Sequence, residues 1–217
     1  MQKAQGSNMI KTDTENPAKP FVLPMAYGIL KGYIKWPFFF LLGTLLTLPS
    51  FKKRIPKDLP EDFVKTVALQ GWMYMRLKEN LGREKAYEIM RAVILPIALA
   101  VQQGNFRSVE AGRTFGNLIK YQQRTNREGP TRWNRMEIEE QSEKRYAFRV
   151  KNCMFHEFFS SIGAPELTKF MCATDNAVFG SYLPEEVIFH RNGLKNRIAD
   201  GASECRFVLE HKDSTEL

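Results

Sequence analysis

An uncharged, aromatic-rich stretch near the beginning of the chain limits its possible folds more than any other feature. The sixteen residues from Trp36 to Phe51 carry no charge, and between Phe21 and Phe51 the only charged side chains are Lys31 and Lys35. Monomeric soluble proteins seldom expose so much contiguous apolar surface. The fold must therefore cover this stretch with protein or place it against lipid.

Two interpretations of residues 20–56 stay open on the sequence alone. Pro37 suits the first turn of a helix and Pro49 is expected to stop it, so the stretch is shorter than the roughly twenty apolar residues of a spanning helix. In the first interpretation the segment lies in the membrane interface, with Trp36 and the basic run Lys52-Lys53-Arg54 at headgroup level. In the second it packs over the rest of the domain or lines a channel to its site.

The composition is that of a globular protein, with 217 residues, 43% hydrophobic and 26% charged, and a formal net charge of +8. The polar first twenty residues do not form a cleavable secretory signal, and an odd number of cysteines favours free thiols, so we expect a cytoplasmic protein. It would be peripheral at the inner face of the membrane if residues 20–56 bind lipid. The basic residues are dispersed and no nucleic-acid-binding motif is present, so no nucleic-acid partner is expected.

Hydrophobic periodicity predicts an α+β fold, with an N-terminal helical half followed by helices packed on a small antiparallel sheet. We expect a flexible tail over 1–19, the hydrophobic segment over 20–56 and a single domain over 57–217. Helices are expected over 58–81, 83–104, 109–123, 154–162 and from 165. Strands are expected over 145–151, 185–190 and 204–210. The last two strands are close enough in sequence to form an antiparallel pair.

The last third of the chain holds all three cysteines, and two of them have a second polar group three residues downstream. Cys153 is followed by His156 and Cys172 by Asp175, a spacing that places both members on one face of a helix. A thiolate is a strong nucleophile, the imidazole could act as its base, and the carboxylate could orient that base or activate water. These donors would also suit tetrahedral zinc, as an alternative to the metal-free and cofactor-free site that we predict.

The position of Asp175 predicts a specific partner for its carboxylate. It lies between Cys172 and the apolar run Ala177-Val178-Phe179, so we expect it to be at least partly buried. A lone buried carboxylate is costly and its pKa rises. We therefore expect backbone amides, His156 or an arginine such as Arg149 to contact it.

Four motifs, in order along the chain, resemble the L-2-amino-thiazoline-4-carboxylic acid hydrolase family of bacterial proteins. They are Leu81-Gly-Arg-Glu-Lys-Ala-Tyr-Glu-Ile89, a strand followed by Cys153 and Glu157, Gly163-Ala-Pro-Glu-Leu167 followed by Cys172 and Asp175, and Gly201-x-x-x-Cys205-x-Phe207. The resemblance covers about residues 60 to 210. The chain departs from the family where Leu194 and Lys195 replace its usual arginine-threonine pair, with Arg191 and Arg197 nearby.

Together, the motifs and the resemblance imply a hydrolase acting on a C–N bond of a cyclic or apolar small molecule. The catalytic candidates are Cys153, Cys172, Asp175, His156 and Glu157. The candidates for binding the substrate are Cys205, Arg149, Arg191 and Phe155. The alternative is a membrane-associated protein that binds a lipid or an isoprenoid without hydrolytic chemistry.

Overall fold

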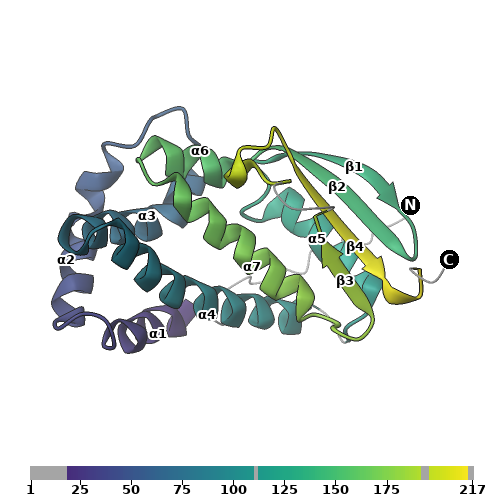
Figure 1. Cartoon of the computed structure of the whole chain (residues 1–217), viewed down its shortest axis with the longest axis horizontal. Coiled ribbons are helices and arrows are strands. Elements are labelled where there is room, and N and C mark those ends of the chain that lie inside the picture. Colours follow the sequence, from purple (N-terminus) through teal and green to yellow (C-terminus); the bar gives the residue numbers. More distant parts are fainter. Residues whose placement is uncertain (1–18, 110–111, 192–195, 215–217) are drawn as a thin grey trace, which may run out of the picture.

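The computed structural model describes residues 19–109, 112–191 and 196–214 as a helical half joined to a four-stranded sheet (Figure 1). The α-helices are α1 (Lys19–Leu30), α2 (Pro37–Lys52), α3 (Glu61–Leu81), α4 (Arg83–Val109), α5 (Phe115–Glu128), α6 (Met154–Ser161) and α7 (Thr168–Gly180). The strands are β1 (Arg135–Gln141), β2 (Arg145–Asn152), β3 (Val187–His190) and β4 (Cys205–His211). Three short 3-10 helices are η1 (Pro165–Leu167), η2 (Ile198–Asp200) and η3 (Lys212–Ser214). The predicted α+β class is confirmed.

The hydrophobic segment forms α1 and α2, and one face of α2 packs on α3. Phe51 stacks on Trp72 with ring centroids 4.8 Å apart, and Trp72 Nε1 donates to Thr47 Oγ1 at 2.8 Å. Arg76 of α3 donates to Thr44 Oγ1 at 2.8 Å. None of the helices in the described ranges combines the length and apolar character needed to cross a bilayer. The proposed division into 20–56 and 57–217 stays a prediction, and residues 1–18 of the expected tail lie outside the described ranges.

Two predicted helix ends were wrong because proline and glycine are tolerated where the rest of the helix is well packed. α2 continues through Pro49 to Lys52. Pro49 has no N–H to donate, but it lies in the last turn of α2, its fixed φ is helical, and its carbonyl still accepts from Lys53 N–H at 3.3 Å. α4 continues past Gly104 to Val109, since a glycine inside a helix costs only about 1 kcal/mol.

The helix predicted over 109–123 is α5, which begins and ends later than predicted. The Thr114 side chain accepts from Asn117 N–H at 3.1 Å, which satisfies one of the free amides of the first turn. The helix then runs to Glu128 and ends before Gly129. Residues 124–128, beyond the predicted end of this helix, are therefore helical.

The sheet has the order β1-β2-β4-β3, and every neighbouring pair is antiparallel. The predicted pairing of the last two strands is confirmed, whereas β1 was not predicted. Cys205 pairs with Val150 near the end of β2, and His190 at the end of β3 pairs with Val208. This register brings the chain just after β2, the chain just after β3 and the beginning of β4 to the same end of the sheet.

The buried side chains form two clusters, and α7 joins them. The first lies between the N-terminal helices and α6, and it includes Phe170 from the beginning of α7. The second lies between α5, α7 and the sheet, and it includes Val178 and Phe179 from the end of α7. Figure 1 shows α7 running between the helical end of the molecule, where α2 lies, and the sheet at the other end. The middle of α7, with Cys172 and Asp175, therefore lies where the two cores meet.

Candidate functional site

Five side chains from four segments of the chain gather at this end of the sheet. Cys153 follows β2, Arg191 follows β3, Cys205 begins β4, and Cys172 and Asp175 lie on α7. The charges of these groups affect one another: the carboxylate of Asp175 raises the pKa of each of the three thiols. We refer to these five residues as the thiol–carboxylate cluster. It unites five of the nine candidates that the sequence predicts.

The central contact of the cluster is an ion pair between Arg191 and Asp175. Arg191 Nη2 donates to Asp175 Oδ2 at 2.8 Å, and Arg191 is only 8% exposed. Its guanidinium also lies over the rings of Phe207, at 4.1 Å, and Phe189, at 5.3 Å. The expected partner for Asp175 exists, but it is Arg191. The arginine suggested from the sequence, Arg149, instead forms ion pairs on the sheet, where it contacts carboxylates of β1 and of the residue before β4.

Two donor atoms of Arg191 are left without acceptors. Nε and Nη1 are buried, and neither has a hydrogen-bond partner within the part of the chain that the structure describes. A guanidinium offers five N–H donors, and leaving buried donors unpaired costs free energy. An oxygen-bearing ligand at this position would satisfy them.

Asp175 combines desolvation with access. Burial raises the pKa of its carboxyl, and the nearby Arg191 guanidinium partly offsets this effect. Nevertheless 36% of its side-chain surface is accessible. A carboxylate whose surroundings are largely protein, but which a small molecule can still touch, is suited to accept a proton from a bound water or substrate.

The three thiols are held in their protonated form. Burial raises the pKa of Cys153 to about 11 and that of Cys172 to about 12, and it also raises the pKa of Cys205. The amides of His156 and Phe155, in the first turn of α6, lower the pKa of Cys153, but burial outweighs them. Cys205 Sγ accepts a hydrogen bond from the Ile198 amide at 3.1 Å. A resting thiolate nucleophile is therefore not what this environment favours at neutral pH.

The side chains of the remaining candidates make their contacts elsewhere. His156 Nδ1 lies 3.3 Å from Thr168 Oγ1, and Glu157 accepts from Asn152 Nδ2 at 2.7 Å. Phe155 packs edge-on against a buried phenylalanine of α3, in the first hydrophobic cluster. The structure thus does not bring His156, Glu157, Phe155 or Arg149 together with the Arg191–Asp175 pair.

One residue outside the predicted set borders the cluster. The charge of Arg197 lowers the pKa of Cys172 and Cys205, although less than burial raises each. Arg197 Nε donates to Asp200, which also contacts Lys169 at 3.4 Å. Arg197 stands four residues before the Gly201 turn, and this position in the sequence could have indicated that it lies near the site.

The zinc alternative finds no ligand set in the described ranges. No group of three or more His, Cys, Asp or Glu side chains there is arranged to hold a metal ion. The thiols and the carboxylate share a region without converging on one point.

Comparison with known proteins identifies one family. The family model described as L-2-amino-thiazoline-4-carboxylic acid hydrolase matches residues 63–209, which include the whole cluster and exclude α1 and α2. No curated protein matches the chain. An Fe(II) unliganded H-NOX variant from K. algicida is 10% identical, with 88% of this chain and 95% of that chain covered and a TM-score of 0.33. A double variant of the Tt H-NOX protein is 16% identical, with 88% and 93% covered and a TM-score of 0.29. Scores this low carry no structural argument.

Proposed function

We propose that this chain, which belongs to the L-2-amino-thiazoline-4-carboxylic acid hydrolase family, hydrolyses a C–N bond of a small cyclic molecule at the thiol–carboxylate cluster. The observation that carries the proposal is the buried Arg191–Asp175 pair, in which two further donor nitrogens of Arg191, Nε and Nη1, lack acceptors among the described residues. An ion pair with a purely structural role would be expected to satisfy its buried donors. Unpaired donors beside an accessible carboxylate fit a site that a ligand completes.

Asp175 is the proposed general base. Its carboxylate takes a proton from a water molecule as the water oxygen bonds to an amide- or amidine-type carbon of the substrate. The electron pair displaced from that carbon moves to its oxygen or nitrogen. As the intermediate collapses, the C–N bond breaks, and the proton passes from Asp175 to the leaving nitrogen. One water is consumed and Asp175 returns to its ionised form.

Arg191 is the proposed binding group for the substrate. Its Nε and Nη1 donors could hold a carboxylate of the substrate or the negative charge that develops during attack. The compound in the family's name carries both a carboxylate and a carbon bonded to two nitrogens. Arg191 would therefore bind the substrate carboxylate in place of the arginine that the family usually has near position 194. The rings of Phe189 and Phe207 give the site an apolar wall.

The thiols act in this proposal as protonated groups. With pKa values of about 11 and 12, Cys153 and Cys172 are almost entirely neutral near pH 7. A neutral thiol is a weak hydrogen-bond donor and a good apolar neighbour. Attack by water rather than by Cys172 predicts that no covalent intermediate forms on the protein.

The test is turnover of a defined panel by the purified full chain. L-2-amino-thiazoline-4-carboxylate and several apolar cyclic amides and amidines are incubated with the protein, and mass spectrometry follows the gain of one water. We expect ring opening with release of an amine, loss of turnover in Asp175→Asn, and full turnover in Glu143→Gln, a change at an exposed carboxylate outside the cluster. Turnover of no panel member would overturn the proposal. Release of a thiol from the thiazoline would instead mean that the C–S bond breaks.

A second candidate function is binding of a lipid or isoprenoid without hydrolysis. Its supporting observation is the exposed apolar surface of α2, where Phe39 is 63% and Leu46 is 72% exposed. In that case a radiolabelled isoprenoid would co-elute with the chain in gel filtration and be recovered unchanged. Every cyclic amide in the panel would stay intact. Hydrolysis of any panel compound by the wild type, lost in Asp175→Asn, would exclude this candidate.

A further inference from the structure

One face of α2 is apolar and is not covered by any other described part of the chain. Its exposed side chains, which we call the α2 outer face, are Trp36 (just before the helix), Phe38, Phe39, Leu42, Leu45 and Leu46. They repeat at helical spacing on the side opposite the contacts with α3. Aromatic and leucine side chains of this size rarely stand together on a solvent-exposed helix without a partner.

The outer face cannot be covered by rotating the helix. On the inner side, Thr44 is fully buried and accepts from Arg76 Nη1, and Phe51 is buried against Trp72. Arg76 also donates to the Phe40 carbonyl at 3.0 Å. These contacts fix α2 on α3, so a rotation of α2 does not bury the outer face against α3.

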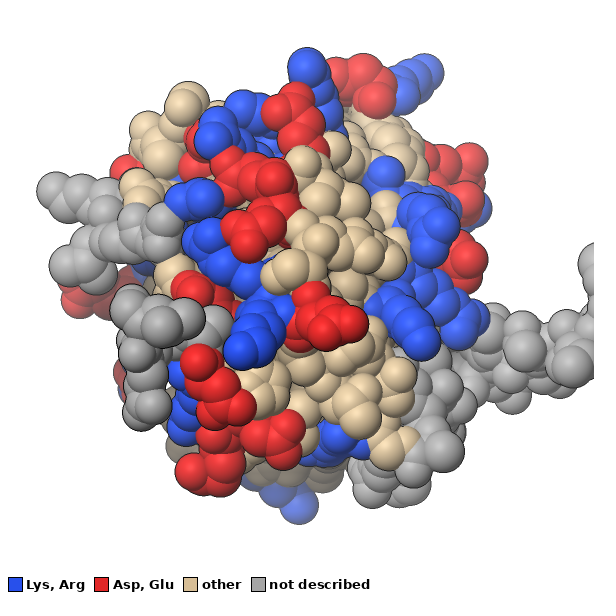
Figure 2. All heavy atoms as spheres, turned by 90° about the vertical axis from the view of Figure 1, so that its right-hand side faces the viewer, with Lys and Arg blue, Asp and Glu red and all other residues tan. Residues whose placement is uncertain are grey.

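The segment that carries this face has charged side chains of one sign only. From Lys19 to Lys57 the sequence has seven basic residues and no acidic residue. Lys31 and Lys35 precede α2, while Lys53 and Arg54 follow it. By contrast, Figure 2 shows the opposite end of the molecule, which carries the sheet, with Lys and Arg interspersed among Asp and Glu. The segment that forms α1 and α2 therefore combines exposed aromatic groups with an excess of basic side chains.

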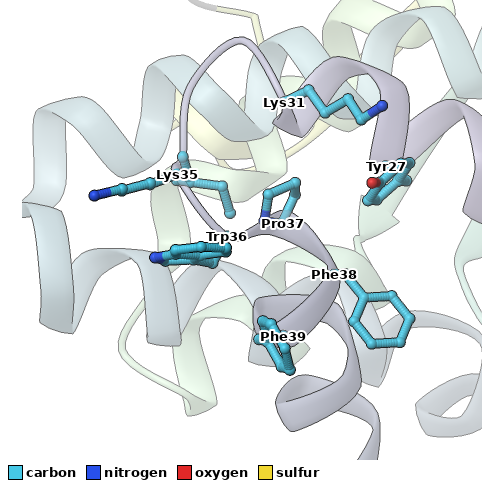
Figure 3. A pocket seen from close by; sticks show the side chains of 8 residues that line it. Tyr27, Lys31, Lys35, Trp36, Pro37, Phe38 and Phe39 are labelled. Carbon is cyan, nitrogen blue, oxygen red and sulfur yellow. The ribbon is translucent and has the colours of Figure 1, made fainter.

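A small recess lies at the turn between α1 and α2, at the edge of the outer face. Its lining includes Tyr27, Lys31, Lys35, Trp36 and Phe38, and contains no acidic residue. Figure 3 shows Tyr27 on α1 and Lys31, just after α1, facing the beginning of α2 across this recess. Lysines next to aromatic rings at the margin of an apolar surface suit the phosphate and interfacial region of a lipid headgroup.

We infer that α1 and α2 dock this protein on the surface of an anionic lipid bilayer, with the α2 outer face inserted at the level of the headgroups. Apolar burial and attraction between lysines and anionic lipid act together in such docking. A second copy of this chain is the poorer occupant, because two outer faces in contact would bring two strongly basic segments together. Docking leaves the sheet, at the other end of the molecule, away from the lipid (Figure 1). This inference does not depend on hydrolysis.

The test is sedimentation of the full chain with vesicles. Phosphatidylcholine vesicles are compared with vesicles in which about a third of the lipid is phosphatidylglycerol, at low and at high salt. We expect the bound fraction on anionic vesicles to exceed that on neutral vesicles by about tenfold or more, and to fall with salt because the lysine contribution is screened.

Two variants and two matched controls locate the surface. Phe38→Ser/Phe39→Ser removes exposed rings, and Lys31→Glu/Lys35→Glu reverses the charge at the recess; each should reduce binding to anionic vesicles about tenfold or more. Ile138→Ser removes an exposed apolar side chain of β1, and Lys144→Glu reverses an exposed charge; both should bind like the wild type. Circular dichroism checks that all four remain folded. Asp175→Asn should also bind normally, which separates this test from that of the hydrolase.

Three outcomes would overturn the inference. The first is no sedimentation of the wild type with anionic vesicles. The second is equal binding by wild type and both outer-face variants. The third is a concentration-dependent dimer in analytical ultracentrifugation that Phe38→Ser/Phe39→Ser abolishes, without vesicle binding by the wild type; the occupant would then be a second copy.

Discussion

Arg191 Nη2 lies 2.8 Å from Asp175 Oδ2, and this hydrogen-bonded ion pair joins the residue after β3 to the middle of α7. The two partners differ in exposure, because the Arg191 side chain is 7% accessible and that of Asp175 is 36% accessible. The arginine is therefore the fixed, buried member, and the carboxylate is the member that a small molecule can reach. This asymmetry allows one pair to hold the fold together and to leave a reactive group available.

The first prediction is that the pair is coupled in stability. Asp175→Asn leaves the buried Arg191 charge without its partner, and Arg191→Met leaves the carboxylate without its own. Arg191→Met should lower the free energy of unfolding by about 2–3 kcal/mol, below the full value for a completely buried pair because Asp175 is partly accessible. Asp175→Asn should cost less, because it also removes a charge that is desolvated in the folded state. The double variant should lose clearly less than the sum. Urea denaturation of the four proteins measures this, and strict additivity would contradict direct coupling.

The second prediction concerns the acid limit of turnover. Burial raises the pKa of Asp175, and Arg191 partly opposes the rise. If the ionised carboxylate is the base, kcat/KM should fall as pH drops through a pKa above the ordinary aspartate value. Arg191→Lys keeps a positive charge and should move this limit little. Arg191→Met removes the charge and should move it to higher pH.

The raised pKa of Asp175 also predicts how the stability of the protein depends on pH. Because the pKa of Asp175 is raised in the folded state, its contribution to stability is fully present below the unfolded pKa and is lost as pH rises through the folded pKa. Glu139 and Asp200 have lowered pKa values, so their contributions are lost as pH falls. Asp175→Asn should therefore remove a part of the pH dependence that opposes acid unfolding by the other carboxylates. Melting curves of the wild type, Asp175→Asn and the control Glu143→Gln over a series of pH values measure this. The same pH dependence of the melting temperature in all three proteins would mean that Asp175 titrates normally.

The third prediction is slow, strongly pH-dependent alkylation of the thiols. With a pKa of about 11, Cys153 is a thiolate in only about one molecule in ten thousand at pH 7. Its labelling by iodoacetamide should rise about tenfold for each pH unit up to pH 10. Cys153 should react first, because Cys172 and Cys205 are buried. Peptide mapping by mass spectrometry measures the three rates, and fast labelling of Cys172 at pH 7 would instead favour a thiolate nucleophile.

The sequence predicted the helices from α2 onward and three of the four strands, because apolar side chains recur there at helical or alternating spacing. It did not predict α1, which lies in the uniformly apolar part of the hydrophobic segment. β1 was missed because its sequence, Arg-Met-Glu-Ile-Glu-Glu-Gln, has polar side chains on both faces, as an edge strand allows. The carboxylates of β1 form ion pairs with neighbouring strands, and Glu139 lies between Arg149 and Arg206. That pairing depends on strand register, which a single segment does not reveal.

The sequence named five residues that gather at the candidate site, but it did not predict the contacts between them. The helical-spacing argument paired Cys153 with His156, but Cys153 precedes α6 with φ −116° and ψ 105°, outside the helix. The face-sharing rule therefore does not apply to that pair, and the imidazole contacts Thr168 instead. The partner of Asp175 could not be deduced because Arg191 reaches it through the β3–β4 register rather than through nearby sequence.

The last prediction tests how closely α3 supports the helix that follows Cys153. A Cβ added at Gly71 on α3 would lie 2.7 Å from Ile162 Cδ1 and 3.1 Å from Phe158 Cε1. Phe158 belongs to α6 and is fully buried, so its ring cannot move away into solvent. Alanine in place of glycine would favour the helix by about 1 kcal/mol, whereas relieving such overpacking costs about 1–3 kcal/mol.

Gly71→Ala should therefore be destabilising by about 1 kcal/mol and should shift α6 slightly, together with Cys153 before its first residue. Gly28→Ala is the matched control, because Gly28 is also inside a helix and a Cβ there meets nothing within 4 Å. That control should be stabilising by about 0.5–1 kcal/mol through helix propensity alone. Denaturation curves of the two variants compare packing with propensity directly. Equal stabilisation by both alanines would mean that Ile162 and Phe158 yield freely, and that α6 is held less tightly against α3 than these distances require.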